Sequence, residues 1–229
     1  MRNIASASTS HTVRLFQWRT LHERHLMNIS IIGTGHVATT LAASWSKAGH
    51  AITLGSRDPQ SKAGQFEYPV ASLADAVAAS DVIVNATPGG QSVEIFTSIG
   101  ADTFAGKTVI DVANAASPSF DLIYPDSSLG QVLQDALPAA KVVKTLNTAA
   151  MTVLVDPSSL SGESSVFVSG DDDGAKDTVR GLLGDLGWAS DSIVDLGGIA
   201  SARGAEYYFV LFFALVQAGG PQFNIKVVR

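Results

Sequence analysis

The stretch NISIIGTGHVATTLAASWSKAGHAITLGSRDP, residues 28–59, decides the fold of this chain. It contains a short apolar run (residues 29–32), a glycine turn, an alanine-rich amphipathic segment and a second apolar run (residues 51–54). A strand, a glycine turn, a helix and a second strand in this order form the first βαβ unit of a dinucleotide-binding fold.

The glycine turn has a physical reason for each of its small residues. Gly33 lets the chain leave the strand in a tight turn, and Gly35 has no Cβ to block a pyrophosphate. Ala38 stands where the pattern usually has a third glycine and still allows the helix to pack closely on the strand. The helix N-terminus then directs free N–H groups at the phosphates. His36 lies inside the turn, and we expect it to face the pyrophosphate or solvent.

The end of the second strand indicates which dinucleotide is bound. Sites for NAD usually place an acid there for the ribose 2′-hydroxyl, whereas NADP sites omit it and bring an arginine to the 2′-phosphate. Here Gly55 and Ser56 occupy the place, and Arg57 follows. A hydroxyl and a guanidinium suit a phosphate dianion, so we predict NADP. In the alternative interpretation Arg57 is a solvated turn residue and Asp58 binds the ribose.

Composition excludes several kinds of chemistry. The chain of 229 residues contains no cysteine, which rules out disulfides, iron–sulfur ligation and thiolate nucleophiles and fits a cytoplasmic protein. Beyond the first 26 residues only His36 and His50 are histidines, so no histidine-rich metal site is expected. The acidic run at residues 171–173 is explained by a helix N-terminus. We therefore predict no metal, and chemistry that a bound cofactor supplies.

The first 26 residues differ in character from the rest. They carry four arginines and one glutamate, a charge of +3, so the formal net charge of −6 leaves −9 for the remainder. An acidic body argues against nucleic-acid binding through a basic face. The Ser-, Thr- and Arg-containing arm has the composition of an organelle transit peptide. We favour the alternative that Met27 is the natural start and that residues 1–26 are a disordered or non-native extension.

Polar or small residues follow three further apolar strands. Residues 81–86, 108–113 and 141–146 read as strands, and they are followed by Thr87, Asn114 and Asn147. In doubly wound folds ligands bind outside the carboxyl ends of the strands. The recurrence predicts a ligand groove at this edge, although the Pro and Gly residues after Thr87 also suit a simple turn.

The whole pattern predicts an α/β protein: a Rossmann-type, doubly wound and mostly parallel sheet with a small C-terminal α/β segment. We expect a dinucleotide-binding domain over residues 27–154 and a smaller domain over residues 155–229, with a linker at 155–164. No apolar run reaches the ~20 residues that span a bilayer, so we expect a soluble protein without a membrane partner. The longest run, residues 207–216, reads as a buried helix or a subunit interface.

The segments IIGTGHVA, LGSRDP, DVIVNATP, KVVKTLNT, VFVSGDDD, DLGGIASAR and FNIKVVR occur in order from Met27 to the end of the chain. Together they resemble the coenzyme F420-dependent NADP oxidoreductases. The N-terminal half also looks like that of ferric reductases and, more distantly, of pyrroline-carboxylate and imine reductases.

This resemblance implies roles for particular residues. Members of the family bind NADP through the glycine turn and the Ser-Arg pair, and Ala86, Thr87 and Pro88 resemble the loop on the nicotinamide side. Asn147 stands where well-matched members have a histidine beside the rings; an amide can orient a ring but cannot donate a charged proton. Family members are typically dimers whose C-terminal part covers the active site. The cofactor-binding residues expected are Gly33, Thr34, Gly35, His36, Val37, Ser56, Arg57, Ala86, Thr87, Pro88, Asn114 and Asn147.

The functional hypothesis is hydride transfer between NADP(H) and a small-molecule acceptor, with coenzyme F420 as the expected co-substrate. Direct transfer between stacked rings makes orientation the main catalytic contribution. Asn147 and Thr87 would position the rings. Two alternatives remain: reduction of another acceptor, such as a flavin, ferric chelate, quinone or imine, and a non-catalytic NADP(H)-sensing protein, which the scarcity of acid–base residues favours.

Overall fold

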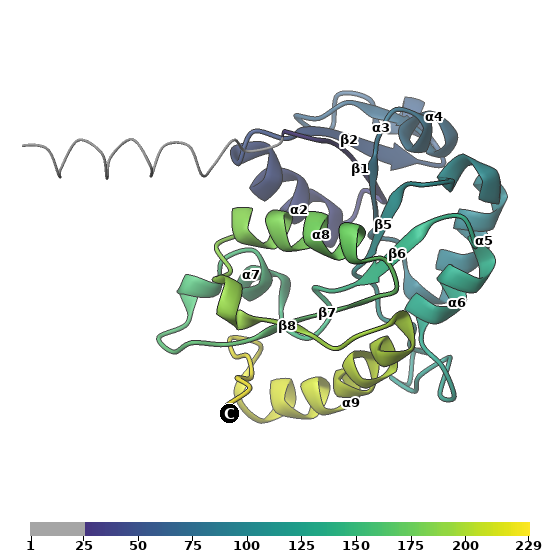
Figure 1. Cartoon of the computed structure of the whole chain (residues 1–229). Helices are drawn as coiled ribbons and strands as arrows, with labels where there is room; N and C mark the ends of the chain where they lie inside the picture. The colour runs from purple at the N-terminus through teal and green to yellow at the C-terminus, as the bar shows by residue number, and fades with distance from the viewer. Residues whose placement is uncertain (1–25) are drawn as a thin grey trace, which may run out of the picture.

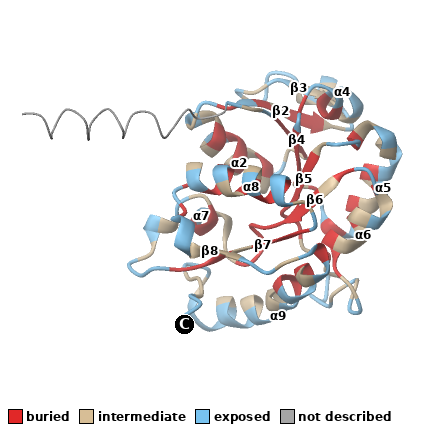
Figure 2. Cartoon of the chain, viewed as in Figure 1, coloured by how far each residue is buried: buried red, intermediate tan, exposed pale blue. Residues whose placement is uncertain are grey.

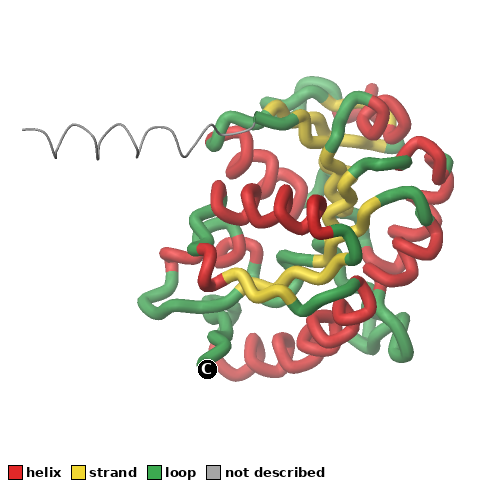
Figure 3. The backbone as a smooth tube through the Cα atoms, viewed as in Figure 1, coloured by secondary structure: helices red, strands yellow, loops and turns green. Residues whose placement is uncertain are grey.

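The computed structural model of the chain describes residues 26–229. Apart from Leu26, the predicted N-terminal extension lies outside the described residues. The remainder is one eight-stranded sheet with helices on both faces, as Figures 1 and 3 show. The predicted Rossmann-type α/β fold is confirmed.

The sheet has the strand order β3-β2-β1-β4-β5-β6-β7-β8. Its first six strands follow the 3-2-1-4-5-6 order of dinucleotide-binding folds and are parallel. β7 pairs with β6 in the antiparallel sense, and β8 pairs with β7 in parallel. The strands are β1 (Asn28–Ile32), β2 (Ala51–Ser56), β3 (Val70–Ser72), β4 (Val82–Asn85), β5 (Thr108–Asp111), β6 (Lys141–Lys144), β7 (Val166–Gly170) and β8 (Ile193–Asp195).

Helices cover the two faces because the central strands are apolar on both sides. All four residues of β4 and of β5 are buried, and four of the five in β1. The α-helices are α2 (His36–Lys47), α3 (Pro59–Lys62), α4 (Leu73–Ala78), α5 (Gly89–Ile99), α6 (Leu129–Ala136), α7 (Met151–Leu154), α8 (Asp173–Asp185) and α9 (Ala202–Gly219). Short 3-10 turns are η1 (Ala101–Phe104), η2 (Pro157–Ser159), η3 (Ser190–Ser192) and η4 (Ile199–Ser201).

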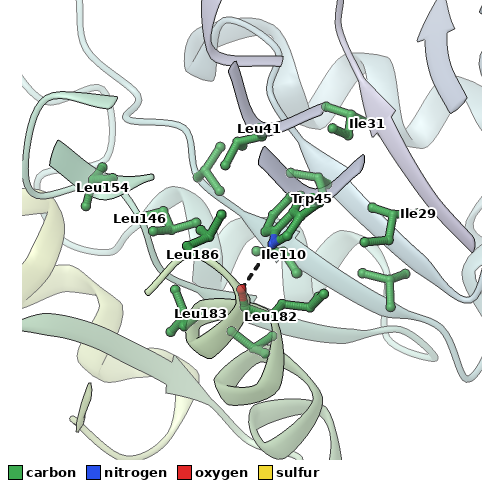
Figure 4. Close-up of a cluster of buried hydrophobic side chains, with 14 of the residues drawn as sticks. Ile29, Ile31, Leu41, Trp45, Ile110, Leu146, Leu154, Leu182, Leu183 and Leu186 are labelled. Carbon is green, nitrogen blue, oxygen red and sulfur yellow. Dashed lines mark hydrogen bonds between the residues drawn. The ribbon is translucent and has the colours of Figure 1, made fainter. Parts of the chain in front are cut away.

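One core lies between the sheet and the helices α2, α7 and α8. Figure 4 shows Trp45 of α2 at its centre, among Leu182, Leu183 and Leu186 of α8 and its C-cap. The Trp45 indole is fully buried and its N–H donates to the Leu182 carbonyl at 3.0 Å. This contact joins the first βαβ unit to a helix that lies beyond the predicted linker. The second core lies on the opposite face, against α4, α5 and α6.

The predicted C-terminal segment shares the sheet with the rest of the chain. β7 and β8 extend the sheet past β6, and α8 packs on β6 and β7. The predicted linker contains η2. A boundary at residue 154 stays a prediction, since strands from both sides of it hydrogen-bond within one sheet.

Helix α9 differs from expectation in two respects. Its buried residues are Ala202, Ala205 and Glu206, all in its first turns, so the predicted apolar stretch at 207–216 is not a buried helix in this chain. Figure 2 shows that most of α9 beyond these turns is exposed or half-buried. The expectation that no segment reaches spanning length is also wrong: Ile199–Gly219, 21 residues, is long and apolar enough by length and composition, which is weak evidence for a membrane span.

His50 and Asp172 both have structural roles in the fold, and that of Asp172 was expected. His50 is buried; its Nδ1 accepts from the Met27 N–H at 3.2 Å and its Nε2 lies 3.0 Å from Asp185. Asp172 caps α8 by accepting from the Ala175 N–H at 2.8 Å. Within residues 26–229 no group of His, Asp and Glu side chains is placed to hold a metal ion.

Candidate cofactor and acceptor site

Two adjoining cavities lie at the carboxyl ends of the parallel strands. We call the one beside the glycine turn the turn cavity, of about 600 Å³, and the other the strand-end cavity, of about 340 Å³. Val37, Ala86, Thr87 and Pro88 line both, so the two cavities adjoin at the sheet edge; we call them together the cleft. This is the position at which doubly wound folds bind ligands.

Gly33 is glycine because the turn passes close to a neighbouring strand. Its φ of +130° is rarely adopted by other residues, and a Cβ there would lie 2.6 Å from the Ala86 carbonyl oxygen. Its N–H donates to the Gly55 carbonyl at 3.0 Å, which ties the turn to the end of β2. The turn is therefore held by both β2 and the segment after β4.

Helix α2 presents an uncapped N-terminus to the turn cavity. Its N-cap is Gly35, which has no side chain to occupy the first N–H groups, and the first intrahelical bond to it comes from Thr39. A Cβ on Gly35 would meet nothing within 4 Å, so the protein itself does not require glycine there. Free N–H groups and the helix dipole make this a site for a pyrophosphate.

The side chains that line the turn cavity carry a net positive charge. Arg57 and Lys62 line it together with Ser56 and one carboxylate, Asp58; Lys62, from α3, is the residue that sequence reasoning missed. Among residues 26–229 neither Arg57 nor Lys62 forms an ion pair, so both charges are available to an anion. The Asp58 carboxylate instead caps α3, accepting from the Ser61 N–H at 3.1 Å, and this bond holds the pKa of Asp58 below its usual value. The geometry favours a 2′-phosphate over a ribose hydroxyl paired with Asp58.

Asn114 and Asn147, which both line the strand-end cavity, form hydrogen bonds with each other. The Asn114 Nδ2 donates to the Asn147 carbonyl at 2.9 Å, and the Asn147 Nδ2 donates to the Asn114 Oδ1 at 3.0 Å and to the Ala205 carbonyl at 3.3 Å. Leu146 has a φ of +53°, which costs ~1 kcal/mol or more in a residue with a Cβ. This strained turn and the paired amides together fix the orientation of Asn147.

Thr87 is held just as firmly. Its N–H and its hydroxyl both donate to the Asn85 Oδ1, at 3.2 and 2.6 Å, and its Oγ lies 2.8 Å from the Ser92 hydroxyl. Because the hydroxyl proton is engaged, Thr87 can offer the cavity an acceptor lone pair rather than a proton. The start of α5 packs directly against the backbone of Asn114: a Cβ on Gly89 would lie 2.2 Å from the Asn114 carbonyl oxygen.

The wall opposite the strand ends is aromatic. Phe209, Phe212 and Phe213 of α9 line the strand-end cavity. The Phe213 ring packs against Phe209 at 4.6 Å and against Phe120 at 4.2 Å between centroids. Sequence reasoning placed these phenylalanines in an apolar helix but could not tell which of them turn inward, because both faces of the helix are apolar.

Among residues 26–229, no ionisable side chain lines the strand-end cavity. Its described lining is Val37, Ala86, Thr87, Pro88, Gly89, Val112, Ala113, Asn114, Leu146, Asn147, Ala149, Ala150, Met151, Phe209, Phe212 and Phe213. With the Thr87 proton engaged, the cavity provides shape, aromatic surface and hydrogen-bond acceptors rather than a general acid. Ring binding suits it better than proton transfer to a reacting atom.

A buried ion cluster lies beside this cavity. The Lys144 ammonium is 2.9 Å from Asp111 and 2.8 Å from Glu206, and all three side chains are at most 4% exposed. Burial raises the pKa of Asp111 despite the neighbouring ammonium. Burial acts to lower the pKa of Lys144, but the two carboxylates hold it above its usual value. Local sequence patterns do not indicate this cluster, since its members lie on β5, β6 and α9.

All predicted site residues line one or both cavities. Gly33, Thr34, Gly35, His36, Ser56 and Arg57 lie in the turn cavity, Asn114 and Asn147 in the strand-end cavity, and Val37, Ala86, Thr87 and Pro88 in both. Their individual roles in binding stay predictions.

The fold and the cleft are those of a Rossmann-type dinucleotide-binding protein. The family model described as NADP oxidoreductase, coenzyme F420-dependent, matches residues 28–115. A crystal structure of a candidate F420-dependent NADP reductase from Arthrobacter sp. FB24 is 38% identical, with a TM-score of 0.82 over 89% of this chain and 100% of that one. The chain belongs to the family of coenzyme F420-dependent NADP oxidoreductases.

Two other similarities are more partial. The chain is 30% identical over 182 residues to metalloreductase STEAP3 of Rattus norvegicus, covering 78% of this chain but 35% of that protein, about a third of its length. A reductive aminase from Aspergillus terreus, solved with NADPH and ethyl levulinate, is 20% identical with a TM-score of 0.61 over 85% of this chain and 63% of that one. At that identity the likeness shows the fold alone.

The first prediction separates cofactor binding from folding at the glycine turn. Gly35→Ala should leave the free energy of unfolding within ~1 kcal/mol of the wild type, because the added methyl has free space. It should weaken NADPH binding at least about tenfold, because the methyl occupies the path of the pyrophosphate. Thermal unfolding and a fluorescence titration measure the two effects. Gly181→Ala, also in free space but on α8, is the control, and equal NADPH affinity in both variants would contradict the pyrophosphate assignment.

The second prediction concerns the choice of dinucleotide. Arg57→Ala should weaken NADPH binding by about 10- to 100-fold, since it removes a charge-assisted contact to the 2′-phosphate, and change NADH binding by less than about twofold. Lys47→Ala, which removes one charge from the other end of α2, should alter neither. Parallel titrations with both dinucleotides provide the measurement. Equal losses for NADPH and NADH would show that Arg57 does not recognise the 2′-phosphate.

Proposed function

We propose that this protein transfers a hydride between NADPH and a planar ring acceptor, with the deazaflavin coenzyme F420 as the acceptor of first choice. The observation that carries the proposal is the pair of adjoining cavities: a turn cavity with cationic and helix N-terminal groups shares four lining residues with an aromatic cavity whose described lining is uncharged. When bound, NADPH supplies the hydride from its nicotinamide ring.

The protein contributes binding, orientation and exclusion of water. The N-terminus of α2 holds the pyrophosphate, and Arg57 with Lys62 holds the 2′-phosphate. The oxygens of Thr87 and Asn147 orient the carboxamide and the ring. Phe209 and Phe213 form the opposite wall, against which the acceptor ring stacks. Holding two rings in contact converts transfer into an effectively unimolecular step.

The absence of an acid in the described lining of the strand-end cavity favours a deazaflavin or flavin over an imine. Reduction of an imine carbon is completed by a proton at the adjacent nitrogen, which calls for a positioned donor. A deazaflavin spreads the new charge over its ring, and solvent can protonate it at the cavity mouth. Asn147 in place of a histidine is compatible with this chemistry.

The experiment is steady-state kinetics with NADPH against F420, FMN, a ferric chelate and a cyclic imine. F420 should have a kcat/KM at least about tenfold above the others, a difference of ~1.4 kcal/mol in transition-state binding. A higher value for the ferric chelate would replace F420 with a metal complex as the acceptor. Tight NADPH binding without turnover on any acceptor would support the sensor hypothesis and contradict the proposal.

We also propose that the protein forms a homodimer through α9. The exposed face of this helix carries Tyr207, Val210, Leu211 and Leu215, which stand at positions i, i+3, i+4 and i+8 of the helix. An uncharged face on a body of net negative charge suits an identical partner, because self-association then brings no like charges together. In a two-fold symmetric dimer the α9 face of each copy packs against the α9 face of the other, so both apolar faces are buried.

The prediction from this face is a change of oligomeric state. Leu211→Glu, at a residue 53% exposed, should convert a dimer into a monomer, because two buried carboxylates would face each other at the interface. Val228→Glu, at a residue 81% exposed near the end of the chain, is the matched control and should stay dimeric. Light scattering after gel filtration measures the mass. A monomeric wild type, or an unchanged Leu211→Glu, would contradict the dimer.

A further inference from the structure

The buried cluster of Asp111, Lys144 and Glu206 joins the two walls of the strand-end cavity. Asp111 lies at the end of β5, Lys144 at the end of β6 and Glu206 in the first turns of α9. Each of these elements, or the segment that follows it, contributes residues to the lining. We call the side formed by the ends of β5 and β6 the strand-end wall, and the side formed by the phenylalanines of α9 the α9 wall. The Lys144 ammonium therefore contacts residues of the elements that form both walls.

On the strand side, the ion cluster is hydrogen-bonded to residues that line the strand-end cavity or hold its lining in place. The Asp111 Oδ1 accepts from the Asn85 Nδ2 at 2.8 Å and from the Ala113 N–H at 3.2 Å, and Lys144 also donates to the Ala113 carbonyl. Asn85 in turn holds Thr87 through its amide oxygen. A chain of hydrogen bonds therefore runs from Lys144 to the lining residue Thr87.

On the helix side, Glu206 is the polar anchor of α9. Its Oε1 contacts Lys144, and its carboxylate accepts from the Leu129 and Gly130 N–H groups, at 2.9 and 3.2 Å, at the start of α6. Phe209 and Phe213 follow it by three and seven residues, so they lie on the same face of the helix. Since most of α9 is exposed, the position of these rings depends on the buried first turns.

A requirement for stability alone does not explain such a cluster. Buried ion pairs are often replaced by apolar side chains without loss of stability, whereas their fixed hydrogen-bond geometry confines the groups they join. Outside the cluster, these three side chains make hydrogen bonds to three segments: the end of β4, the residues after β5 and the start of α6. Geometry rather than net stability is the property that this arrangement supplies.

We propose that Lys144 and Glu206 are positioning residues for hydride transfer: they set the separation between the strand-end wall, which holds the nicotinamide, and the α9 wall, which holds the acceptor. The proposal rests on the proposed function for the identity of the two rings. Neither residue lines the cavity, so each acts through the walls that it connects.

The test is Glu206→Asp, which keeps the charge and shortens the arm by one methylene. NADPH affinity should stay within about twofold, since the turn cavity lies on β1 and β2, while the single-turnover rate of hydride transfer to F420 should fall by about 10- to 100-fold. Emission from bound NADPH should also fall, because a displaced α9 admits water to the nicotinamide. A folded Glu206→Asp with wild-type rate and wild-type emission would overturn the proposal.

A second variant covers the case in which one altered charge prevents folding. Replacing all three residues together, by Asp111→Asn, Lys144→Met and Glu206→Gln, leaves no uncompensated charge and should fold. It should show the same slow transfer and weak emission; wild-type values there would likewise overturn the positioning role. Asp177→Asn, which breaks the exposed ion pair with Arg180, is the control and should match the wild type.

The emission measurement needs no acceptor and so separates the two proposals. If the wild type reduces no acceptor but Glu206→Asp lowers the emission of bound NADPH, the proposed function fails, while the part of the proposal in which the cluster sets the position of α9 relative to the bound nicotinamide stands. If the wild type reduces F420 and both variants retain its rate and emission, the proposed function stands and the positioning role fails.

Discussion

The buried ammonium of Lys144 connects β5, β6 and α9, the elements beside the strand-end cavity. Taking a charge out of water costs several kcal/mol, and it is tolerated here because two carboxylates and a carbonyl surround it. Removing one partner would leave an unpaired buried charge, a change that typically costs ~3–5 kcal/mol. β5, β6, α6 and α9 are thereby constrained to one arrangement, and the strand-end cavity lies beside it.

The two halves of the cleft rely on different physics. The turn cavity uses an uncapped helix N-terminus, two cations without ion-pair partners in the described chain and a glycine with free space around it, all suited to a polyanion. The strand-end cavity is uncharged, and its polar groups are engaged with one another through Asn114, Asn147, Thr87 and Asn85. The first half can bind tightly without chemistry, while the second can orient a ring without exchanging protons.

Helix α9 has two apolar faces with different surroundings. Its inward face supplies Phe209 and Phe213 to the cavity, and its outward face is exposed along Val210 and Leu211. Sequence patterns report only that both faces are apolar, which is why residues 207–216 read equally well as a buried helix or an interface. The segment Ile199–Gly219, which contains this helix, is also as long and as apolar as a membrane span. Glu206, buried in the ion cluster, shows instead that its first turns are docked on the protein.

The sequence by itself determined the first βαβ unit, the apolar strands and the glycine-turn and Ser56-Arg57 parts of the turn cavity, because turn chemistry and hydrophobic periodicity act within about 30 neighbouring residues. It also placed Thr87, Asn114 and Asn147 at one edge, since parallel strands end together. Only the tertiary structure decided that Asn114 pairs with a residue 33 positions away, and that Glu206 meets the start of α6 across 77 positions. Such contacts arise from how helices pack on the sheet, and a lysine in an apolar strand carries no local sign of its distant partners.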